Sequence, residues 1–261
     1  IEVKTALTDE QYYEMIVPYE DAKKLLMARL EVLNHTLYQN SVLPPIHHIE
    51  SRIKRKQSIE EKMKRKQLEE SVMSIKENLR DIAGIRVICY TRQDIAFLSD
   101  ALKKQKDLIV IRERDYIRNP KQNGYRSYHL ILGVPVYYMD QKEWNSTACE
   151  EKHSRYHFPE KRMFVTSMEY YPVEVQLRTV GMDFWASMDH RLCYTQQRED
   201  EKEGRKKLLS YAKVMEKMEA ELEKLLKSEM ENCGTITKKK KRGQTDAELF
   251  NRSRGSIPFA D

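Results

Sequence analysis

Two acidic residues and one basic segment stand out as groups that could do chemistry together. Asp81 directly precedes an apolar, strand-like run, and Glu174 lies inside a second such run. The segment 52–66 holds eight Lys and Arg residues against two Glu, and this excess of six equals the net charge of the whole chain, +6. Carboxylates supply the hard oxygen ligands that Mg²⁺ prefers, while Lys and Arg neutralise phosphate groups. Brought together, these residues would suit a Mg²⁺ ion shared with substrate phosphates.

Each of these residues also has a purely structural interpretation. Aspartate often caps a turn, as Asp81 could, and a basic helix face such as that of 62–66 is commonly just solvated. Along 171–178, apolar and polar residues alternate strictly, so a strand there would have one core face and one face carrying Glu174 and Gln176. A polar face is also normal on an edge strand, so both interpretations of Glu174 stay open.

A tight turn is expected at Asn123-Gly124, directly before the strand-like run that follows Tyr125. An aromatic ring at the entrance of a strand can stack on a nucleobase, which is worth about 1–3 kcal/mol in nucleic-acid binders. The alternative is a hairpin tyrosine that packs on its own sheet. The eight glycines form neither a Walker loop nor a Rossmann glycine cluster, so any phosphate must be held by side chains.

The elements that must position these residues can be read from periodicity. A helix is predicted from Tyr19 to Tyr38, after a break at Pro18, and Ser58 with Glu61 forms a capping-box pattern that starts a second helix through Lys66. Further helices are predicted at 94–104 and 179–194. Strands are predicted at 85–90, 108–112, 128–138 and, in two pieces, 163–178.

Three further features concern the second half of the chain. The segment 140–160 shows no strand or helix periodicity and is interpreted as an inserted loop, either a surface elaboration or a lid. The segment 232–261 is a basic tail that we expect to be disordered, either solvated or able to bind RNA, with solvation preferred. Apolar residues at helical seam spacing indicate packing along another helix, within the chain or in a second subunit: Leu208, Tyr211, Met215, Met218, Leu222 and Leu225.

The composition is that of a globular protein. The 261 residues are 40% hydrophobic and 34% charged, with a mean hydropathy of −0.76. No apolar run approaches the roughly 20 residues that cross a bilayer, so we expect no membrane partner and a cytoplasmic location. Four scattered cysteines argue against a zinc site and a disulfide framework.

Four segments in this order carry a more specific signal: SRIKRKQSIEEKMKRK (51–66), RDIAGIRVICY (80–90), RDYIRNPKQNGYRSYH (114–129) and VEVQLRTVGMDFWASMDHRLCY (173–194). Together they resemble the synthetase domain of the RelA/SpoT family, and most closely its stand-alone small alarmone synthetases. The resemblance covers about residues 10–230. It implies an α+β fold of the nucleotidyltransferase-like type, with a mixed, largely antiparallel sheet flanked by helices and helical extensions at both ends.

The domain limits follow from this fold. We expect one synthetase domain over 1–231, helical in 1–80, with the sheet core in 81–194 and a C-terminal helix in 197–231. The resemblance also implies a homotetramer. Hydrolysis of the alarmone belongs to a separate N-terminal domain of the family, so we expect synthesis alone.

The activity that the resemblance implies is that of a GTP diphosphokinase. Such enzymes move the β,γ-pyrophosphate of ATP to the ribose 3′-oxygen of GDP or GTP, which gives (p)ppGpp and AMP. Asp81 and Glu174 match the Mg²⁺ ligands, and Glu174 is also the candidate base for the 3′-hydroxyl.

The resemblance divides the remaining candidate residues between the two nucleotides. ATP is assigned to Arg52, Lys54, Lys62, Arg65 and Arg86, with Arg52 and Arg86 sandwiching the adenine. The acceptor nucleotide, GDP or GTP, is assigned to Tyr125, which stacks on guanine, and to Lys121, Asn123, His129, Arg114, Gln176 and Asp183. The competing hypothesis is a catalytically silent nucleotide or RNA sensor on the same scaffold. Retention of both carboxylates speaks against it, because a pure binder does not need them.

Overall fold

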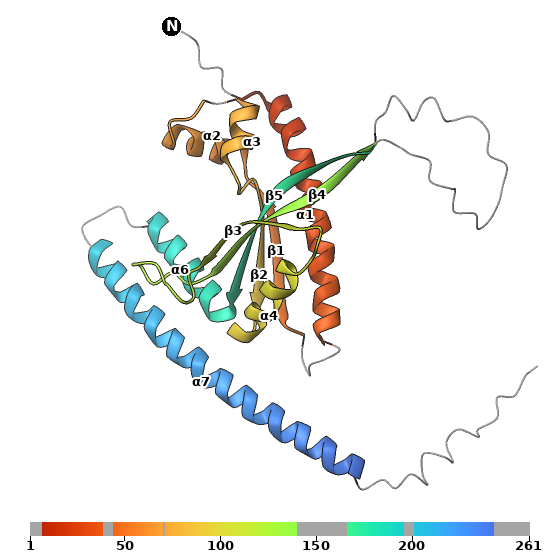
Figure 1. Cartoon of the computed structure of the whole chain (residues 1–261). Coiled ribbons are helices and arrows are strands. Elements are labelled where there is room, and N and C mark those ends of the chain that lie inside the picture. The colour runs from red at the N-terminus through yellow and green to blue at the C-terminus, as the bar shows by residue number, and fades with distance from the viewer. Residues whose placement is uncertain (1–6, 39–43, 70, 140–165, 196–200, 243–261) are drawn as a thin grey trace, which may run out of the picture. The chain divides into compact units, whose positions relative to one another are not determined.

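A five-stranded mixed sheet forms the centre of the fold (Figure 1). The structure is a computed structural model that describes residues 7–38, 44–69, 71–139, 166–195 and 201–242. Its strands are β1 (Ile46–Ile53), β2 (Ala83–Cys89), β3 (Ile109–Asp115), β4 (Tyr128–Met139) and β5 (Thr166–Thr179). Their order in space is β1-β2-β5-β4-β3, in which β2 pairs with β5 in parallel and the other three pairings are antiparallel. The predicted mixed, largely antiparallel sheet is confirmed.

The described helices are α1 (Asp9–Tyr38), α2 (Lys56–Arg65), α3 (Val72–Asn78), α4 (Arg92–Lys103), α6 (Val180–Thr195) and α7 (Glu201–Arg242). The chain divides into two compact units, Ile1–Ala212 and Lys213–Asp261, so α7 contributes to both. The first unit holds the sheet and all the candidate site residues. Within the described part of the chain, no helix has the length and apolar character needed to cross a membrane.

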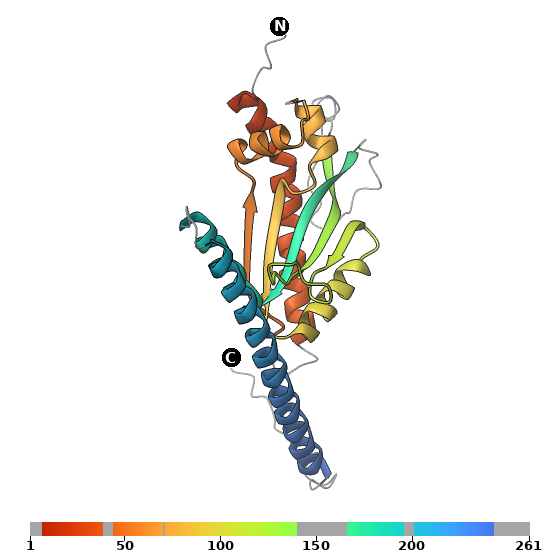
Figure 2. The ribbon, with the colours of Figure 1, turned by 90° about the vertical axis from the view of Figure 1, so that its left-hand side faces the viewer.

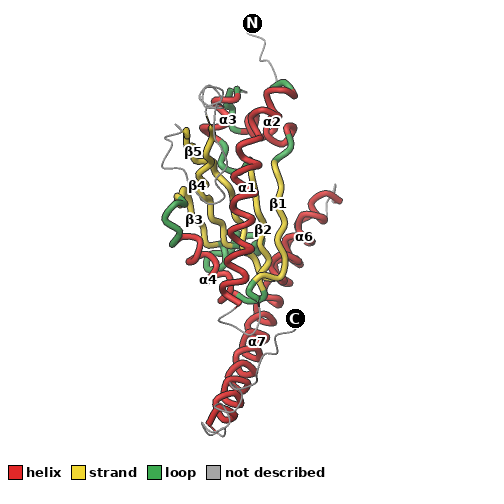
Figure 3. The backbone as a smooth tube through the Cα atoms, turned by 90° about the vertical axis from the view of Figure 1, so that its right-hand side faces the viewer, coloured by secondary structure: helices red, strands yellow, loops and turns green. Residues whose placement is uncertain are grey.

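Helix α1 lies across one face of the sheet. The helix is behind the strands in Figure 2 and in front of them in Figure 3. Its most deeply buried residues recur every three or four positions, as expected for a helix with one face in the core: Met15, Tyr19, Ala22, Leu26 and Leu30. Helix α4 adds Ile95, Leu98 and Leu102 to the same hydrophobic cluster. The opposite face of the sheet is therefore left for polar groups.

The alternation predicted for 171–178 is confirmed in β5. Val173, Val175 and Leu177 are fully buried in the core shared with α1 and α4. Full burial of each such aliphatic side chain is worth about 1.5–3 kcal/mol, so the core fixes which face β5 turns outward.

Helix α1 begins at Asp9 rather than at Tyr19, and it continues through Pro18. The predicted break is therefore wrong. Thr8 and Gln11 form a reciprocal side-chain to backbone pair at the start of the helix, with N···O distances of 3.1 Å. An interior proline costs a helix about 3 kcal/mol. Here Met15 on one side of Pro18 and Tyr19 on the other are both buried in the sheet core, which outweighs that cost.

Strand β1 lies in the region 1–80 that we expected to be helical. Seven of its eight residues from Ile46 to Ile53 are at least partly exposed, in an irregular order, so the sequence carries no strand alternation. Helix α3 was also missed, although Ser71 caps it by accepting a hydrogen bond from the backbone N–H of Ser74. The capping box predicted at Ser58 is wrong, since α2 begins at Lys56 without a side-chain cap.

The remaining differences are at element ends. Strand β5 runs unbroken from Thr166, where two pieces were predicted. Helix α7 runs to Arg242, so residues 232–242 are helical rather than a disordered tail. The predicted insert and the start of the predicted strand at 163 lie outside the described residues, because 140–165 are not described. The same holds for 243–261 of the predicted tail.

The apolar seam of α7 is mostly exposed. Leu208 is buried, but Tyr211, Met218, Leu222 and Leu225 each expose half or more of their surface. Both interpretations of this seam, packing within the chain and contact with a second subunit, stay predictions for the part of the helix after Ala212, which belongs to the second unit.

Candidate active site

The face of the sheet opposite α1 carries polar side chains from all five strands, set by the strand register. One row of directly opposed residues runs Arg52, Gly84, Glu174, Ile131, Arg112. The next row runs Glu50, Arg86, Gln176, His129, Arg114. Residues directly opposite one another share a face of the sheet. Residues from distant parts of the chain thus form one polar strip.

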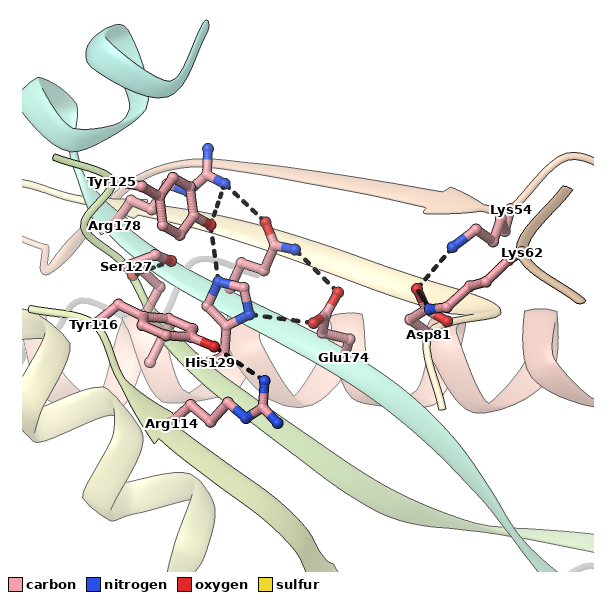
Figure 4. Close-up of polar contacts among 12 residues, drawn as sticks. Lys54, Lys62, Asp81, Arg114, Tyr116, Tyr125, Ser127, His129, Glu174 and Arg178 are labelled. Carbon is pink, nitrogen blue, oxygen red and sulfur yellow. Dashed lines mark hydrogen bonds and ion pairs between the residues drawn. The ribbon is translucent and has the colours of Figure 1, made fainter. Parts of the chain in front are cut away.

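Asp81 lies just before β2 and is held by two lysines (Figure 4). Its Oδ2 accepts hydrogen bonds from Lys54 Nζ at 2.7 Å and from Lys62 Nζ at 2.6 Å. Lys54 follows β1 and Lys62 belongs to α2, so two separate elements converge on one oxygen atom. The other oxygen, Oδ1, is buried without a hydrogen-bond partner among the described residues. Burial opposes ionisation of this carboxyl, but the two lysine hydrogen bonds outweigh it and hold the pKa of Asp81 below its ordinary value.

Glu174 lies in the middle of β5 with both oxygens engaged. Oε1 is 3.2 Å from His129 Nδ1, and Oε2 accepts a hydrogen bond from Gln176 Nε2 at 3.0 Å. Burial again opposes ionisation, and the contacts with His129 and Gln176 outweigh it, so the pKa of Glu174 is also lowered. Both carboxylates are therefore ionised at neutral pH.

Glu174 belongs to a closed ring of five hydrogen-bonded side chains. His129 Nε2 lies 2.8 Å from the hydroxyl of Tyr125, and that hydroxyl also accepts a hydrogen bond from Arg178 Nη2 at 2.8 Å. Arg178 Nη2 donates as well to Gln176 Oε1 at 3.0 Å, which completes the circuit back to Glu174. Figure 4 shows this ring on β4, β5 and the turn before β4. The candidate base and the candidate stacking ring are thus held by one network.

The ring of Tyr125 is surrounded by cations and aromatic groups. Lys121 Nζ lies 4.7 Å from its centroid, and Arg178 Cζ lies 5.2 Å from it. Tyr116 and Trp185 make edge contacts with it, at centroid distances of 6.1 and 6.5 Å. This setting favours a flat, electron-rich ligand beside the tyrosine.

Gly124 explains how the turn before Tyr125 fits its surroundings. Its φ of +92° lies in the region that favours glycine, and an added Cβ would lie 2.8 Å from Ala212 Cβ. The start of α7 is fixed in place here, because Trp185 Nε1 donates to the carbonyl of Leu208 at 3.0 Å. The turn that presents Tyr125 is therefore packed against α6 and the first turns of α7.

Two cavities meet at the carboxylates. The first, of about 190 Å³, is lined by Arg52, Lys54, Gly84, Arg86 and Gln176 together with Glu50, Ser51, Ile82 and Ile85. The second, of about 370 Å³, is lined by Lys62, Lys66, Arg80, Arg112, Arg114 and His129 together with Glu77, Asn78 and Ile131. Asp81 and Glu174 line both. The expected spatial convergence of these two acids beside the basic segment is therefore present.

Five predicted site residues line neither cavity: Arg65, Lys121, Asn123, Tyr125 and Asp183. Arg65 is exposed on α2 and lies outside the residues that line the two cavities. Asn123 shapes the turn, because its Oδ1 accepts from the backbone N–H of Tyr125 and its Nδ2 donates to Asp189. Asp183 bonds to Arg178 Nη1 at 2.9 Å, so its carboxylate is engaged with the protein.

The analysis of sequence patterns missed several residues that the structure brings to the site. Arg178 is almost fully buried and connects three other side chains, although its place in the 174, 176, 178 alternation was a usable signal. Lys66, Arg80 and Arg112 line the second cavity, Lys66 directly after α2, Arg80 before β2 and Arg112 in β3. Lys66 belongs to the basic segment 52–66, but no local pattern marks Arg80 or Arg112, since cations are common everywhere on a surface.

The surroundings of Asp81 show that the residues present could hold a divalent cation. Its Oδ1 has no hydrogen-bond partner in the part of the chain that the structure describes, and Glu174 lines the same cavities. Within the described residues no group of three or more His, Cys, Asp or Glu side chains is arranged to hold a metal ion. Such a pair of carboxylates suits Mg²⁺, which usually takes one or two protein carboxylates and completes its shell with phosphate oxygens and water.

Comparison with known proteins agrees with this architecture. The family model described as the region found in RelA/SpoT proteins matches residues 51–199, more than half of the chain. The chain therefore belongs to the RelA/SpoT family.

Individual relatives are similar over most of the chain. It is 31% identical to the GTP pyrophosphokinase YwaC of Bacillus subtilis over 193 residues, which covers 74% of this chain and 79% of YwaC. A GTP pyrophosphokinase family protein from Streptococcus pneumoniae is 28% identical, with a TM-score of 0.67 over 86% of this chain and 97% of that one. The small alarmone synthetase 1 of Bacillus subtilis, bound to its product pppGpp, is 28% identical, with a TM-score of 0.66 over 84% and 98%.

Proposed function

We propose that this chain transfers the β,γ-pyrophosphoryl group of ATP to the ribose 3′-hydroxyl of GDP or GTP, with release of AMP. The observation that carries the proposal is that Asp81 and Glu174 lie together at the boundary of two cation-lined cavities. A transfer between two nucleotides needs two such spaces that meet at the reacting phosphate. The names of the relatives, GTP pyrophosphokinase and small alarmone synthetase, support the same reaction.

The first cavity suits the adenine of ATP. Arg52 opposes Gly84 in the sheet, so Arg86, two residues further along β2, is its diagonal neighbour on the same face. Diagonal neighbours of this kind are about 7–8 Å apart, which leaves room for one flat ring between two guanidinium planes. This arrangement supports the assignment of Arg52 and Arg86 as an adenine sandwich.

The lysines beside Asp81 suit the ATP phosphates. Lys54 and Lys62 each keep about a fifth of their side-chain surface exposed, so incoming phosphate oxygens can reach them. Phosphates that attract the two ammonium groups would leave the Asp81 carboxylate available to a cation. Bound Mg²⁺ would supply charge neutralisation on the β- and γ-phosphate oxygens.

Tyr125 suits the guanine of the acceptor. Lys121 now lies over this ring, but Lys121 is exposed, and an exposed cation–π contact is worth about 0.5–1 kcal/mol. Stacking of a base on an aromatic ring is worth about 1–3 kcal/mol, so a guanine would displace Lys121 from the face of Tyr125. The displaced ammonium group would then be free to bind a phosphate.

Glu174 is placed to act as the base. In the transfer, the 3′-oxygen attacks the β-phosphorus, the bond between that phosphorus and the α,β-bridging oxygen breaks, and AMP leaves with that oxygen. The proton of the 3′-hydroxyl passes to the Glu174 carboxylate. The lowered pKa of Glu174 keeps it ionised before substrates bind, and the nearby anionic phosphates would raise its pKa and so its basicity.

Incubation of the chain with ATP, Mg²⁺ and either GDP or GTP, followed by separation of the nucleotides, tests the proposal. AMP together with a guanosine tetra- or pentaphosphate is expected, and the two reactions in parallel give the acceptor preference. Nucleotide binding without any AMP would instead support the silent sensor.

We also propose self-association through α7. Val214, Met218, Leu222 and Leu225 are each more than half exposed along this helix, and a homotetramer would bury them. Light scattering at micromolar concentration tests this part. A monomer would contradict it.

A further inference from the structure

We propose that Asp183 and Arg178 couple the two nucleotide subsites, so that each nucleotide increases the affinity of the chain for the other. The inference rests on the proposed function and deepens it. It also gives Asp183 a different role from the one expected, since Asp183 would bridge two arginines rather than contact the acceptor.

A single carboxylate oxygen connects the two sides of the site. Asp183 Oδ1 lies 2.9 Å from Arg178 Nη1 and 3.6 Å from Arg86 Nη1. Arg86 lines the first cavity, where we place adenine. Arg178 donates its other terminal nitrogen to the hydroxyl of Tyr125, where we place guanine. The path between the two bases therefore runs through four side chains: Arg86, Asp183, Arg178 and Tyr125.

Burial makes the contact between Arg178 and Asp183, on the acceptor side of the bridge, the rigid one. The Arg178 side chain is 6% exposed and that of Asp183 is 25% exposed, so their charge-assisted hydrogen bond is weakly screened. Arg178 cannot leave Asp183 without burying an unpaired charge. Any displacement of Asp183 must therefore shift Arg178 and, with it, Tyr125 and Gln176.

The donor half of the bridge is the adjustable half. Arg86 Nη1 has two competing carboxylate partners: it donates a hydrogen bond to Glu50 Oε2 at 3.3 Å and forms an ion pair with Asp183 Oδ1 at 3.6 Å. Glu50 is more than half exposed, so its pull on Arg86 is weak and easily lost to solvent. A base stacked on Arg86 would fix the guanidinium in one orientation and thereby fix Asp183 as well.

Coupling follows because the adjustable residue is ordered only once. The first nucleotide to bind pays the entropic cost of fixing Arg86 and its contact with Asp183, and the second binds to a bridge that is already ordered. Because binding free energies are reciprocal, ATP must increase the affinity for GDP by the same factor as GDP increases the affinity for ATP.

Calorimetric titration of the full chain tests this coupling. The probes are GDP and α,β-methylene-ATP with Mg²⁺, since a carbon bridge between the α- and β-phosphates prevents the transfer. For the unaltered chain we expect saturating analogue to lower the dissociation constant of GDP on the order of 5- to 10-fold. In Asp183→Asn, which keeps the shape but removes the charge, we expect a ratio of about 2 or less.

Two further variants make the result specific. Arg178→Lys keeps a positive charge next to Asp183, but a single ammonium group cannot reproduce the two-nitrogen connection from Asp183 to Tyr125. It should lose the coupling as Asp183→Asn does, and it carries the test if Asp183→Asn does not fold. Asp107→Asn is the matched control, because Asp107 pairs with Arg29 of α1 and lines neither cavity.

The outcomes are distinguishable. Loss of the coupling ratio in Asp183→Asn or Arg178→Lys, with the control unchanged, supports the bridge. Binding of both nucleotides with no coupling in the unaltered chain, or with a ratio that both folded variants retain, overturns the bridge and leaves the proposed function intact. Failure of the unaltered chain to bind either nucleotide overturns both.

Discussion

Asp81 and Glu174 have equally exposed side chains, 21% each, yet their surroundings differ in kind. Two ammonium groups on flexible side chains hold Asp81 by one oxygen, while its other oxygen has no hydrogen-bond partner among the residues described. Glu174 has both oxygens engaged by side chains from two paired strands, within a closed ring. Since the two side chains are equally buried, what distinguishes the two acids is the number and the kind of their hydrogen-bond partners.

The difference indicates two roles for two similar acids. The lysine partners of Asp81 are suited to exchange, because phosphate can replace the carboxylate at each of them. The ring around Glu174 is suited to fix an orientation, since moving any one member breaks two hydrogen bonds. One acid would thus change partners as substrate binds, and the other would stay in place for the proton transfer.

The largest effect is expected at the fixed acid. Glu174→Gln keeps the size of the side chain but cannot accept the 3′-hydroxyl proton, so kcat should fall by about 10²–10⁴-fold. The affinity for α,β-methylene-ATP should change little. Glu169→Gln, an exposed acid on the same strand, is the control. Unchanged turnover in Glu174→Gln would rule out its role as base.

A smaller effect is expected at the exchanging lysines. Lys62→Gln removes a charge-assisted hydrogen bond, worth about 1.5–3 kcal/mol, so KM for ATP should rise about 10- to 100-fold while kcat changes less.

Arg65→Gln gives the comparison, because the resemblance assigns Arg65 to the same phosphates but the structure places it outside both cavities. We expect the KM of this variant for ATP to change by less than about threefold, which corresponds to a loss of under about 1 kcal/mol of binding free energy. An equal rise in both variants would show that α2 rearranges when ATP binds.

Acidification should reveal the contribution that each of the two acids makes to the stability of the folded chain. Both pKa values are lowered in the folded chain, from ordinary values of 3.8 for Asp81 and 4.5 for Glu174, so the unfolded chain binds more protons at low pH. Their stabilisation is therefore present above those ordinary values and is lost as the pH falls through the lowered ones.

Urea unfolding between about pH 6 and about pH 3 measures this loss. Asp81→Asn and Glu174→Gln should each lose less stability on acidification than the unaltered chain does. Equal losses in all three proteins would contradict the assigned contacts.

The smallest effect is expected at a residue that supports Asp81 indirectly. The hydroxyl of Tyr12 on α1 donates to the backbone carbonyl of Lys54 at 3.0 Å. Tyr12→Phe should lower the free energy of unfolding by about 0.5–1.5 kcal/mol. It should raise KM for ATP about twofold, with little change in kcat. A fall in kcat instead of a rise in KM would mean that this bond positions Glu174 as well.

Much of the fold was accessible to pattern analysis, and the failures have physical causes. The strict alternation along β5 predicted which face Glu174 occupies, because burying Val173 and Val175 fixes the other face. Strand β1 was missed because it is an edge strand whose pairing with β2, rather than its own burial, makes it a strand. The break at Pro18 was predicted from local cost alone, whereas the sheet beneath α1 compensates for it.

The candidate site shows the same division. The sequence by itself determined which residues can carry charge or stack on a base, and it determined the alternation that turns them to one side of a strand, since both depend on side-chain chemistry and near neighbours. Only the tertiary structure decided that β2 and β5 are adjacent and parallel, with Gly84 opposite Glu174. That pairing brings Asp81 and Glu174 to the same cavities and closes the ring through Arg178. Local patterns do not specify which distant strands pair, because pairing is settled by packing the whole core at once.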